Sequence, residues 1–257
     1  MSSTHRQRIL EQFTQQAAPF ANAPGIRNQE ALDRVVTIAG AGADDTVLDV
    51  ACGPGLLVCA FARVVRHASG IDVTLAMLEQ ARIEQQRSGL ANVTWHLGDV
   101  PPLPFADQGF SIVASRFALH HVLDPLAVVK EMRRVCQVGG RVVIADSAPS
   151  PEKADAFNAM EHLRDPSHVC AMPIGQLRGL FRDAGLDKPR EQFYRLEGEL
   201  EGLLERSFPN AGDADRIRQM FEDSLVNDAL DMATCRRAGK ICFGFPIAIL
   251  AARNPRS

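Results

Sequence analysis

The stretch from Thr46 to Leu57, which reads TVLDVACGPGLL, constrains this chain more than any other. Its first half is an apolar, β-branched run that carries Asp49, and its second half is a turn with glycines at 53 and 55. A helical pattern then follows from Leu56 through Val65. The stretch predicts a strand, a tight turn and a helix. Glycines in such a turn let a ligand approach the main chain closely.

The spacing of these glycines argues against two common classes of ligand site, the dinucleotide site and the P-loop. Leu57 and Val58 follow Gly55, so the dinucleotide pattern G-x-G-x-x-G is absent, and no Lys-Ser/Thr pair completes a P-loop. The helix start still offers unpaired N–H groups. A carboxylate at Asp49, beside the turn, suits a cationic ligand group better than a phosphate. The turn therefore predicts a site for a small polar ligand.

Strand and helix patterns alternate from residue 46 to residue 146, which predicts an α/β fold with a doubly wound, Rossmann-like, mostly parallel sheet. Ligands on such sheets sit beyond the carboxyl ends of the strands. The sequence predicts seven strands, at about 46–50, 68–72, 93–97, 110–115, 140–146, 186–196 and 240–252, and helices at about 56–66, 74–88, 124–136 and 173–184. Pro246 predicts that the last strand lies at an edge or a bulge.

Composition excludes several classes of function. The net charge of −3 and a pI near 6.2, with no basic stripe, argue against a nucleic-acid partner. No run approaches the roughly 20 apolar residues of a membrane span, and the chain begins without an apolar signal core. We therefore expect a cytoplasmic protein without membrane association. The six cysteines form no C-x-x-C pair, so we expect no metal site and no disulfides, but mostly buried thiols.

Three motifs in order identify a family resemblance. They are DVACGPG at 49–55, GID at 70–72 and Gly98-Asp99. Together they resemble the motif series of class I S-adenosylmethionine (SAM) dependent methyltransferases, in the small-molecule branch similar to those of ubiquinone and menaquinone biosynthesis. The resemblance covers about residues 45–190. It implies SAM as cofactor, S-adenosylhomocysteine as product, and an antiparallel last strand.

The resemblance also implies a cofactor site. Asp49 and the glycine turn would hold the amino acid end of SAM, Asp72 would accept both ribose hydroxyls, and Asp99 with Val100 would border the adenine. As alternatives, Asp72 is a helix cap and Gly98-Asp99 an ordinary turn. The full set that we assign to the cofactor is Asp49, Ala51, Cys52, Gly53, Gly55, Asp72, Val73, Met77, Gly98, Asp99, Val100, Arg116, Phe117 and His121.

The stretch Ser115 to Val122, SRFALHHV, supplies the catalytic candidates. If a helical turn begins at Phe117, Arg116 and His120 share a face. An imidazole can take a proton near neutral pH, and a guanidinium can hold an anionic substrate oxygen. Similar enzymes that methylate a phenolic or enolic carbon use an Arg and His arrangement in this loop. For His121 we expect structural packing, with a contact to SAM.

Two insertions, at about 150–172 and 198–236, are expected to cover the substrate. The first contains RDPSH at 164–168, in which Arg164 is a substrate-binding candidate and His168 a second candidate base. The alternative is that this stretch is only a capped turn. Residues 1–40 are expected to form a helical segment or lid that precedes the methyltransferase domain at 41–257. Phe20 in that segment would pack near the SAM methyl and the substrate, or else lie on a helix that closes the sheet edge.

Methyl transfer requires an acceptor that loses a proton or is already anionic. We therefore predict methylation of a small phenolic or enolic molecule, on carbon or oxygen, with a His base and with Arg116 holding the acceptor oxygen. One alternative is transfer to sulfur or a metalloid. Another is a protein of this fold that binds SAM without methylating, as a cyclase or binding protein, because fold does not fix function. The expected partner is a small molecule, and a homodimer is left open.

Overall fold

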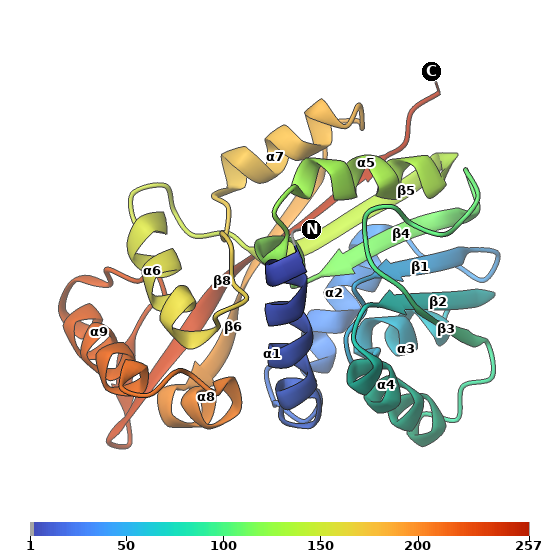
Figure 1. The fold of residues 1–257 in the computed structure, drawn as a ribbon. Helices are drawn as coiled ribbons and strands as arrows, with labels where there is room; N and C mark the ends of the chain where they lie inside the picture. The colour runs from blue at the N-terminus through green and yellow to red at the C-terminus, as the bar shows by residue number, and fades with distance from the viewer. Residues whose placement is uncertain (1–2, 257) are drawn as a thin grey trace.

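The computed structural model describes residues 3–256 and is built on one central sheet (Figure 1). The strand order is β3-β2-β1-β4-β5-β8-β6, with β7 paired to β8. The strands are β1 (Thr46–Val50), β2 (His67–Asp72), β3 (Val93–Leu97), β4 (Phe110–Arg116), β5 (Cys136–Ser147), β6 (Arg190–Glu199), β7 (Cys235–Arg237) and β8 (Lys240–Arg253). The predicted doubly wound sheet is confirmed, and the three-residue β7 adds to the seven expected strands.

Strand β1 lies where the order of the sheet reverses. It pairs in parallel with β2 on one side and with β4 on the other. Two crossovers that leave in opposite directions open a crevice at the carboxyl end of such a strand. Asp49 and the glycine turn sit at this end, so the fold places the most distinctive stretch of the sequence at the expected ligand site.

Helices cover both faces of the sheet (Figure 1). On one face pack α2 (Gln29–Ala39), α3 (Leu56–Ala62) and α4 (Leu75–Arg87), and on the other α5 (Pro125–Val135) and α7 (Ile174–Asp183). Successive strand residues serve opposite faces: in β1, Val47 belongs to the first core and Leu48 to the second. The alternation leaves β1 buried on both sides, as is usual for parallel strands.

The N-terminal segment begins with a long helix that contains a proline. Helix α1 (Ser3–Ala21) continues through Pro19. Pro19 lies in the last turn of α1, which Asn22 N extends by donating to Ala18 O (3.2 Å). The side chain of Asn28 caps the start of α2 by accepting a hydrogen bond from Ala31 N (3.0 Å).

The two insertions pack against each other. The first forms α6 (Ala154–Arg164), and the second forms α8 (Leu200–Ser207), α9 (Asp213–Asn227) and β7. They share a core of their own, with Phe157 and Met160 from α6, Leu204 from α8 and Phe221 from α9. In Figure 1 this unit lies beside the long β6–β8 pair, at the end of the sheet away from β3.

The prediction that Pro246 marks an edge or a bulge is wrong, because β8 lies between β5 and β6 and its register with β6 continues unbroken through Pro246. Pairing with β5 stops at Ser147, opposite Ile247, so Pro246 is the first residue of β8 beyond that partner. A missing N–H removes no bond to β5 there, and Ala148 N still donates to the Pro246 carbonyl (2.8 Å).

Three of the six cysteines are buried, Cys235 and Cys242 are partly buried, and Cys170 is exposed, so the expectation of mostly buried thiols holds for half of them. No helix within residues 3–256 has the length and apolar character needed to cross a membrane.

Candidate functional site

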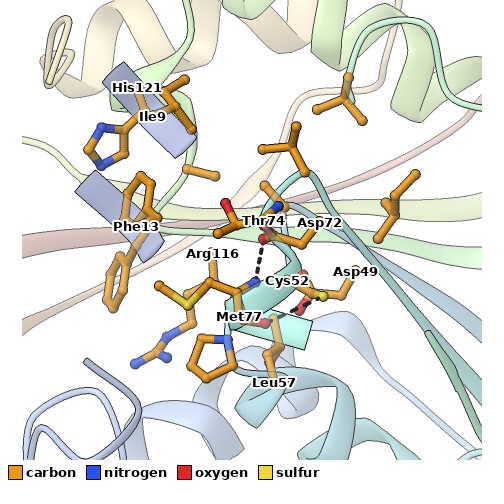
Figure 2. Close-up of a pocket in the computed structure, with 18 of the residues that line it drawn as sticks. Ile9, Phe13, Asp49, Cys52, Leu57, Asp72, Thr74, Met77, Arg116 and His121 are labelled. Atoms are coloured by element: carbon orange, nitrogen blue, oxygen red, sulfur yellow. Dashed lines mark hydrogen bonds between the residues drawn. The ribbon is translucent and has the colours of Figure 1, made fainter. Parts of the chain in front are cut away.

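A first cavity, of about 920 Å³ including its part open to solvent, lies at the carboxyl ends of β1, β2 and β4 (Figure 2). Thirteen of the fourteen residues assigned to the cofactor from the sequence line it. They are Asp49, Ala51, Cys52, Gly53, Asp72, Val73, Met77, Gly98, Asp99, Val100, Arg116, Phe117 and His121. Residues that lie far apart in the chain are thus brought to one concave surface.

Gly55 is the exception, and the structure corrects its role. Gly55 has a φ of +73°, and a Cβ added there would lie 2.4 Å from Cη2 of Trp95 and 2.8 Å from Cβ of Ala81. The position therefore makes room for the Trp95 ring beneath the turn. At Gly53, by contrast, the nearest atom to an added Cβ is Sδ of Met77 at 4.0 Å, so Gly53 is the glycine that opens the main chain toward the cavity.

Asp49 is buried at the floor of the cavity with an incomplete set of hydrogen bonds. Asp49 is 1% exposed, and its Oδ1 has no hydrogen-bond partner within residues 3–256. Burial raises the pKa of Asp49 well above its usual range, Arg116 opposes this rise, and the charge of Asp72 adds to it. An unpartnered buried carboxylate is costly. A cationic ligand group would remove this cost.

Asp72 holds the glycine turn in place. Its Oδ2 accepts from Gly53 N (2.8 Å) and its Oδ1 from Thr74 N (2.9 Å), as the dashed lines in Figure 2 indicate in part. Each carboxylate oxygen can accept a second bond, so both remain able to bind a ligand hydroxyl. Burial raises the pKa of Asp72 while these backbone N–H groups oppose the rise.

Helix α1 covers part of the first cavity, which is lined by its side chains Ile9 and Phe13. His5 Nε2 hydrogen-bonds to the carbonyl of His121 (2.8 Å), and Arg6 Nε to Oδ2 of Asp99 (3.1 Å). The Phe13 ring meets the His121 ring edge-on, with centroids 4.9 Å apart. His121 therefore packs as expected while also lining the cavity.

The same helix is tied to the insertion unit. Gln12 Nε2 and Gln16 Nε2 both donate to the carbonyl of Ser207, at the end of α8, at 2.7 and 3.1 Å. Helix α1 thus lines the first cavity and is also hydrogen-bonded to Ser207, which lines a second cavity.

The second cavity, of about 790 Å³ with its open part, lies between the sheet, α1, α6 and α8. Its walls are largely aromatic and aliphatic, with Phe243 and Phe245 of β8 among them. Phe20, Ile26 and Phe117 line both cavities. Phe117 has a φ of +58°, which is unusual for a bulky residue and typical of functional sites. The two cavities thus meet at an apolar wall of three side chains.

His120, in the short 3-10 turn η1 (Leu119–His121), lines the second cavity and has a carboxylate partner. Its Nδ1 makes a short hydrogen bond with Oδ1 of Asp146. Asp146 is 2% exposed and is itself fixed by Leu119 N (2.9 Å) and Ser147 N (2.7 Å). Burial alone would lower the pKa of His120, but Asp146 raises it above its usual value. With Nδ1 engaged, Nε2 is the nitrogen left for a ligand.

The predicted cluster of Arg116 and His120 is wrong. The αL conformation of Phe117 separates them, so Arg116 lines the first cavity and His120 the second. Both Nη atoms of Arg116 donate to the carbonyl of Ile26 (3.3 Å each), and its Cζ lies 4.2 Å from the centre of the Phe117 ring. Arg116 therefore supports two members of the shared wall.

Of the two candidates from the first insertion, Arg164 lines a cavity and His168 does not. His168 lines neither cavity, and its Nε2 bonds to Oδ1 of Asn158 (2.7 Å). Burial, followed by the neighbouring histidines, lowers its pKa far below the usual value. Ser167 N donates to Asp165 Oδ1 (2.9 Å), which matches the capped-turn alternative. Arg164 lines the second cavity, but its fork is bound to Glu161 at 2.7 and 2.6 Å.

The sequence interpretation missed Asp146. The signal was present, because Asp146 is the last residue of the predicted strand 140–146 and so falls at the same sheet edge as Asp49 and Asp72. The aromatic residues of β8 in the second cavity carried no such signal. Within the described part of the chain, no group of three or more His, Cys, Asp or Glu side chains could hold a metal ion.

Known proteins resemble this chain in sequence and in fold. A model described as a methyltransferase domain matches residues 48–144. The uncharacterized methyltransferase YcgJ of Bacillus subtilis is 30% identical over 223 residues, which cover 86% of this chain and 86% of the relative. A demethylmenaquinone methyltransferase of Staphylococcus aureus is 35% identical over 195 residues, 74% of this chain and 71% of that protein. The crystal structure of the YcgJ protein superimposes with a TM-score of 0.80 at 25% identity, covering 89% of this chain and 99% of that one.

Proposed function

Because this chain belongs to the class I SAM-dependent methyltransferases, we propose that it transfers the methyl group of SAM to a small phenolic or enolic acceptor in the second cavity. The observation that carries the proposal is the wall that the two cavities share. Phe20, Ile26 and Phe117 border both cavities, so a donor in one and an acceptor in the other would come into direct contact where the cavities adjoin beside these side chains. Alignment of the two reacting atoms is the main requirement of this in-line displacement. When bound, SAM supplies a methyl group on a positively charged sulfur.

The polar groups that line the first cavity are suited to bind SAM. The unpartnered Oδ1 of Asp49 would accept from the ammonium group, and Gly53 leaves the main chain open beside it. Asp72 retains acceptor capacity for the ribose hydroxyls, and Asp99 and Val100, which line the same cavity, would border the adenine. These positions match the family motifs at 49–55, 70–72 and 98–99.

The wall of Phe20, Ile26 and Phe117 would align the two ligands and exclude water. We assign Arg116 to the support of this wall, through its bonds to the Ile26 carbonyl and its contact with the Phe117 ring, in place of the acceptor-holding role expected from the sequence. Because its guanidinium is held by these contacts, Arg116 is not free to move toward an acceptor oxygen.

His120 is the proposed general base. Its Nε2 would take the proton from the acceptor, while Asp146 fixes the ring and stabilises the imidazolium that results. The bond from Nδ1–H to a buried carboxylate is the arrangement that orients histidine bases in general. His168 is not proposed as a base, because it lines neither cavity, and because burial lowers its pKa so far that its imidazole is a poor proton acceptor.

The identity of 35% with a demethylmenaquinone methyltransferase supports a quinone-like ring compound as acceptor. Aromatic walls around the second cavity support the same class of molecule. We further propose that residues 41–257 form one catalytic domain, that the segment 1–40 covers the cofactor, and that the two insertions cover the acceptor.

Calorimetric titration with SAM and with S-adenosylhomocysteine tests the cofactor site. We expect Asp49→Asn to weaken both, because the amide keeps the shape but not the charge. Asp44→Asn, at an exposed position of the loop before β1, is the matched control. Phenolic and enolic compounds are then incubated with SAM and the products weighed by mass spectrometry. A product heavier by one methyl group supports the proposal; a product of unchanged mass, or a folded protein that binds neither nucleoside, contradicts it.

A further inference from the structure

The charges that line the second cavity are almost all compensated. His120 is paired with Asp146, and Glu161 with the fork of Arg164. Glu197 has a side chain that is 73% exposed and lies 3.8 Å from Arg237. These groups leave no net charge for a ligand to meet.

Arg206 is different. It lies in the last turn of α8 and lines the second cavity. Its Nη1 sits 3.1 Å from the point where a Cβ on Gly202 would be, so the guanidinium folds back along its own helix over a glycine. Among the charged residues that line this cavity, all within the described chain, Arg206 alone makes no hydrogen bond or ion pair.

A simpler explanation is that Arg206 is a surface cation at a helix C-terminus, where the helix dipole favours positive charge. That explanation accounts for its place on α8 but not for its position on the cavity wall. The adjacent carbonyl of Ser207, which such a cation would be expected to bind, already accepts from Gln12 and Gln16. The acidic neighbour Glu205 is exposed and does not pair with it.

We propose that Arg206 binds a carboxylate of the acceptor, so that the substrates are apolar carboxylic acids that also carry the phenolic or enolic group. The inference rests on the proposed function and adds a substrate class to it. A planar guanidinium matches a carboxylate with two parallel hydrogen bonds. One uncompensated cation balances one negative charge, while the aromatic walls take the apolar body.

In this arrangement the protein would hold the acceptor at two of its groups. The carboxylate would lie at α8, and the hydroxyl or enol at His120 beside the shared wall. A neutral acceptor of the same shape would give the partly exposed Arg206 guanidinium no negative group to bind. Arg206 would thus determine specificity without taking part in methyl transfer.

Matched pairs of acids and esters test the inference. Calorimetry on the complete chain saturated with S-adenosylhomocysteine would compare p-coumarate with its methyl ester, and phenylpyruvate with its methyl ester. We expect each acid to bind about tenfold or more tightly than its ester, the usual value of a hydrogen bond to a charged group. Arg206→Gln should remove the preference and Arg206→Lys should keep part of it. Arg216→Gln, on α9 outside the cavity, is the control.

The two proposals fail in different ways. If neither acid is preferred over its ester, or if the preference survives in Arg206→Gln, the carboxylate inference is wrong even when SAM binding and methyl transfer are intact. If the protein binds no nucleoside or methylates nothing in the phenolic and enolic screen, the proposed function itself fails. Unchanged nucleoside affinity in Arg206→Gln shows that this variant is folded.

Discussion

His120 and Asp146 stand 26 residues apart in the chain and are hydrogen-bonded through Nδ1 and Oδ1 at the ends of neighbouring parallel strands. His120 lines the second cavity, where we propose that the acceptor binds. A buried carboxylate behind a histidine fixes which ring nitrogen is free. The pair therefore predicts both a rate effect and a pH effect.

We expect His120→Ala to lower kcat by roughly 10² or more, the usual contribution of a general base, while calorimetry shows unchanged affinity for SAM. His162→Ala, which alters a histidine that lines neither cavity, should keep its activity and serves as the control. Unchanged turnover in His120→Ala would contradict the assignment of the base.

We expect Asp146→Asn to lower kcat and to move the acidic limb of its pH profile to lower pH. Burial lowers the pKa of His120 and Asp146 raises it, so loss of the carboxylate charge leaves burial to act alone. A base must be deprotonated to work, and a lower pKa lets it work at lower pH. The measurement is kcat between pH 5 and pH 9 for both proteins. An unmoved limb would mean that another group titrates.

The free energy of unfolding should decrease as pH falls from about 6.5 to about 4. Burial, and then the charge of His120, lower the pKa of His121 to about 4, whereas the unfolded chain takes up the proton near 6.5. A lowered histidine pKa contributes stability above 6.5 that is lost in this window, here up to about 3 kcal/mol. His120 acts oppositely, because its raised pKa contributes stability that is lost as pH rises through it.

Urea unfolding across this range gives the measurement. His121→Gln should flatten the slope, and His67→Gln, at a partly exposed position on β2, should leave it unchanged. Equal slopes in all three proteins would show that His121 is not the group that takes up the proton.

We expect Gly55→Ala to reduce the free energy of unfolding by about 2 kcal/mol or more, because the new Cβ meets the Trp95 ring in addition to the strain of a positive φ. Gly89→Ala has a similar φ of +64° with nothing within 4 Å, so it should show the backbone cost alone, about 1 kcal/mol. Denaturant unfolding compares them. Equal losses would remove the packing explanation.

Local patterns carried most of what the sequence predicted correctly. The strand, turn and helix around Gly53 follow from neighbouring residues, and the alternation of elements then determines the sheet and its carboxyl edge. This is why nearly all of the residues expected around the first cavity do line it.

The errors arose where distant residues meet. Trp95 comes from another strand to occupy the space beside Gly55, and nothing in the turn itself reveals it. The backbone reversal at Phe117 separates Arg116 from His120, although a helical spacing placed them together. Pro246 was expected at an edge because its strand partners cannot be read from its own segment.

The paired bonds from Gln12 and Gln16 to the Ser207 carbonyl have a kinetic consequence. Helix α1 covers the first cavity and is hydrogen-bonded to Ser207, which lines the second cavity. Displacement of this helix would therefore open both cavities together. We expect release of the spent nucleoside and release of the methylated compound to share one barrier. Loss of the hydrogen bonds from Gln12 and Gln16 to Ser207 would then shorten the residence times of both the nucleoside and the methylated compound.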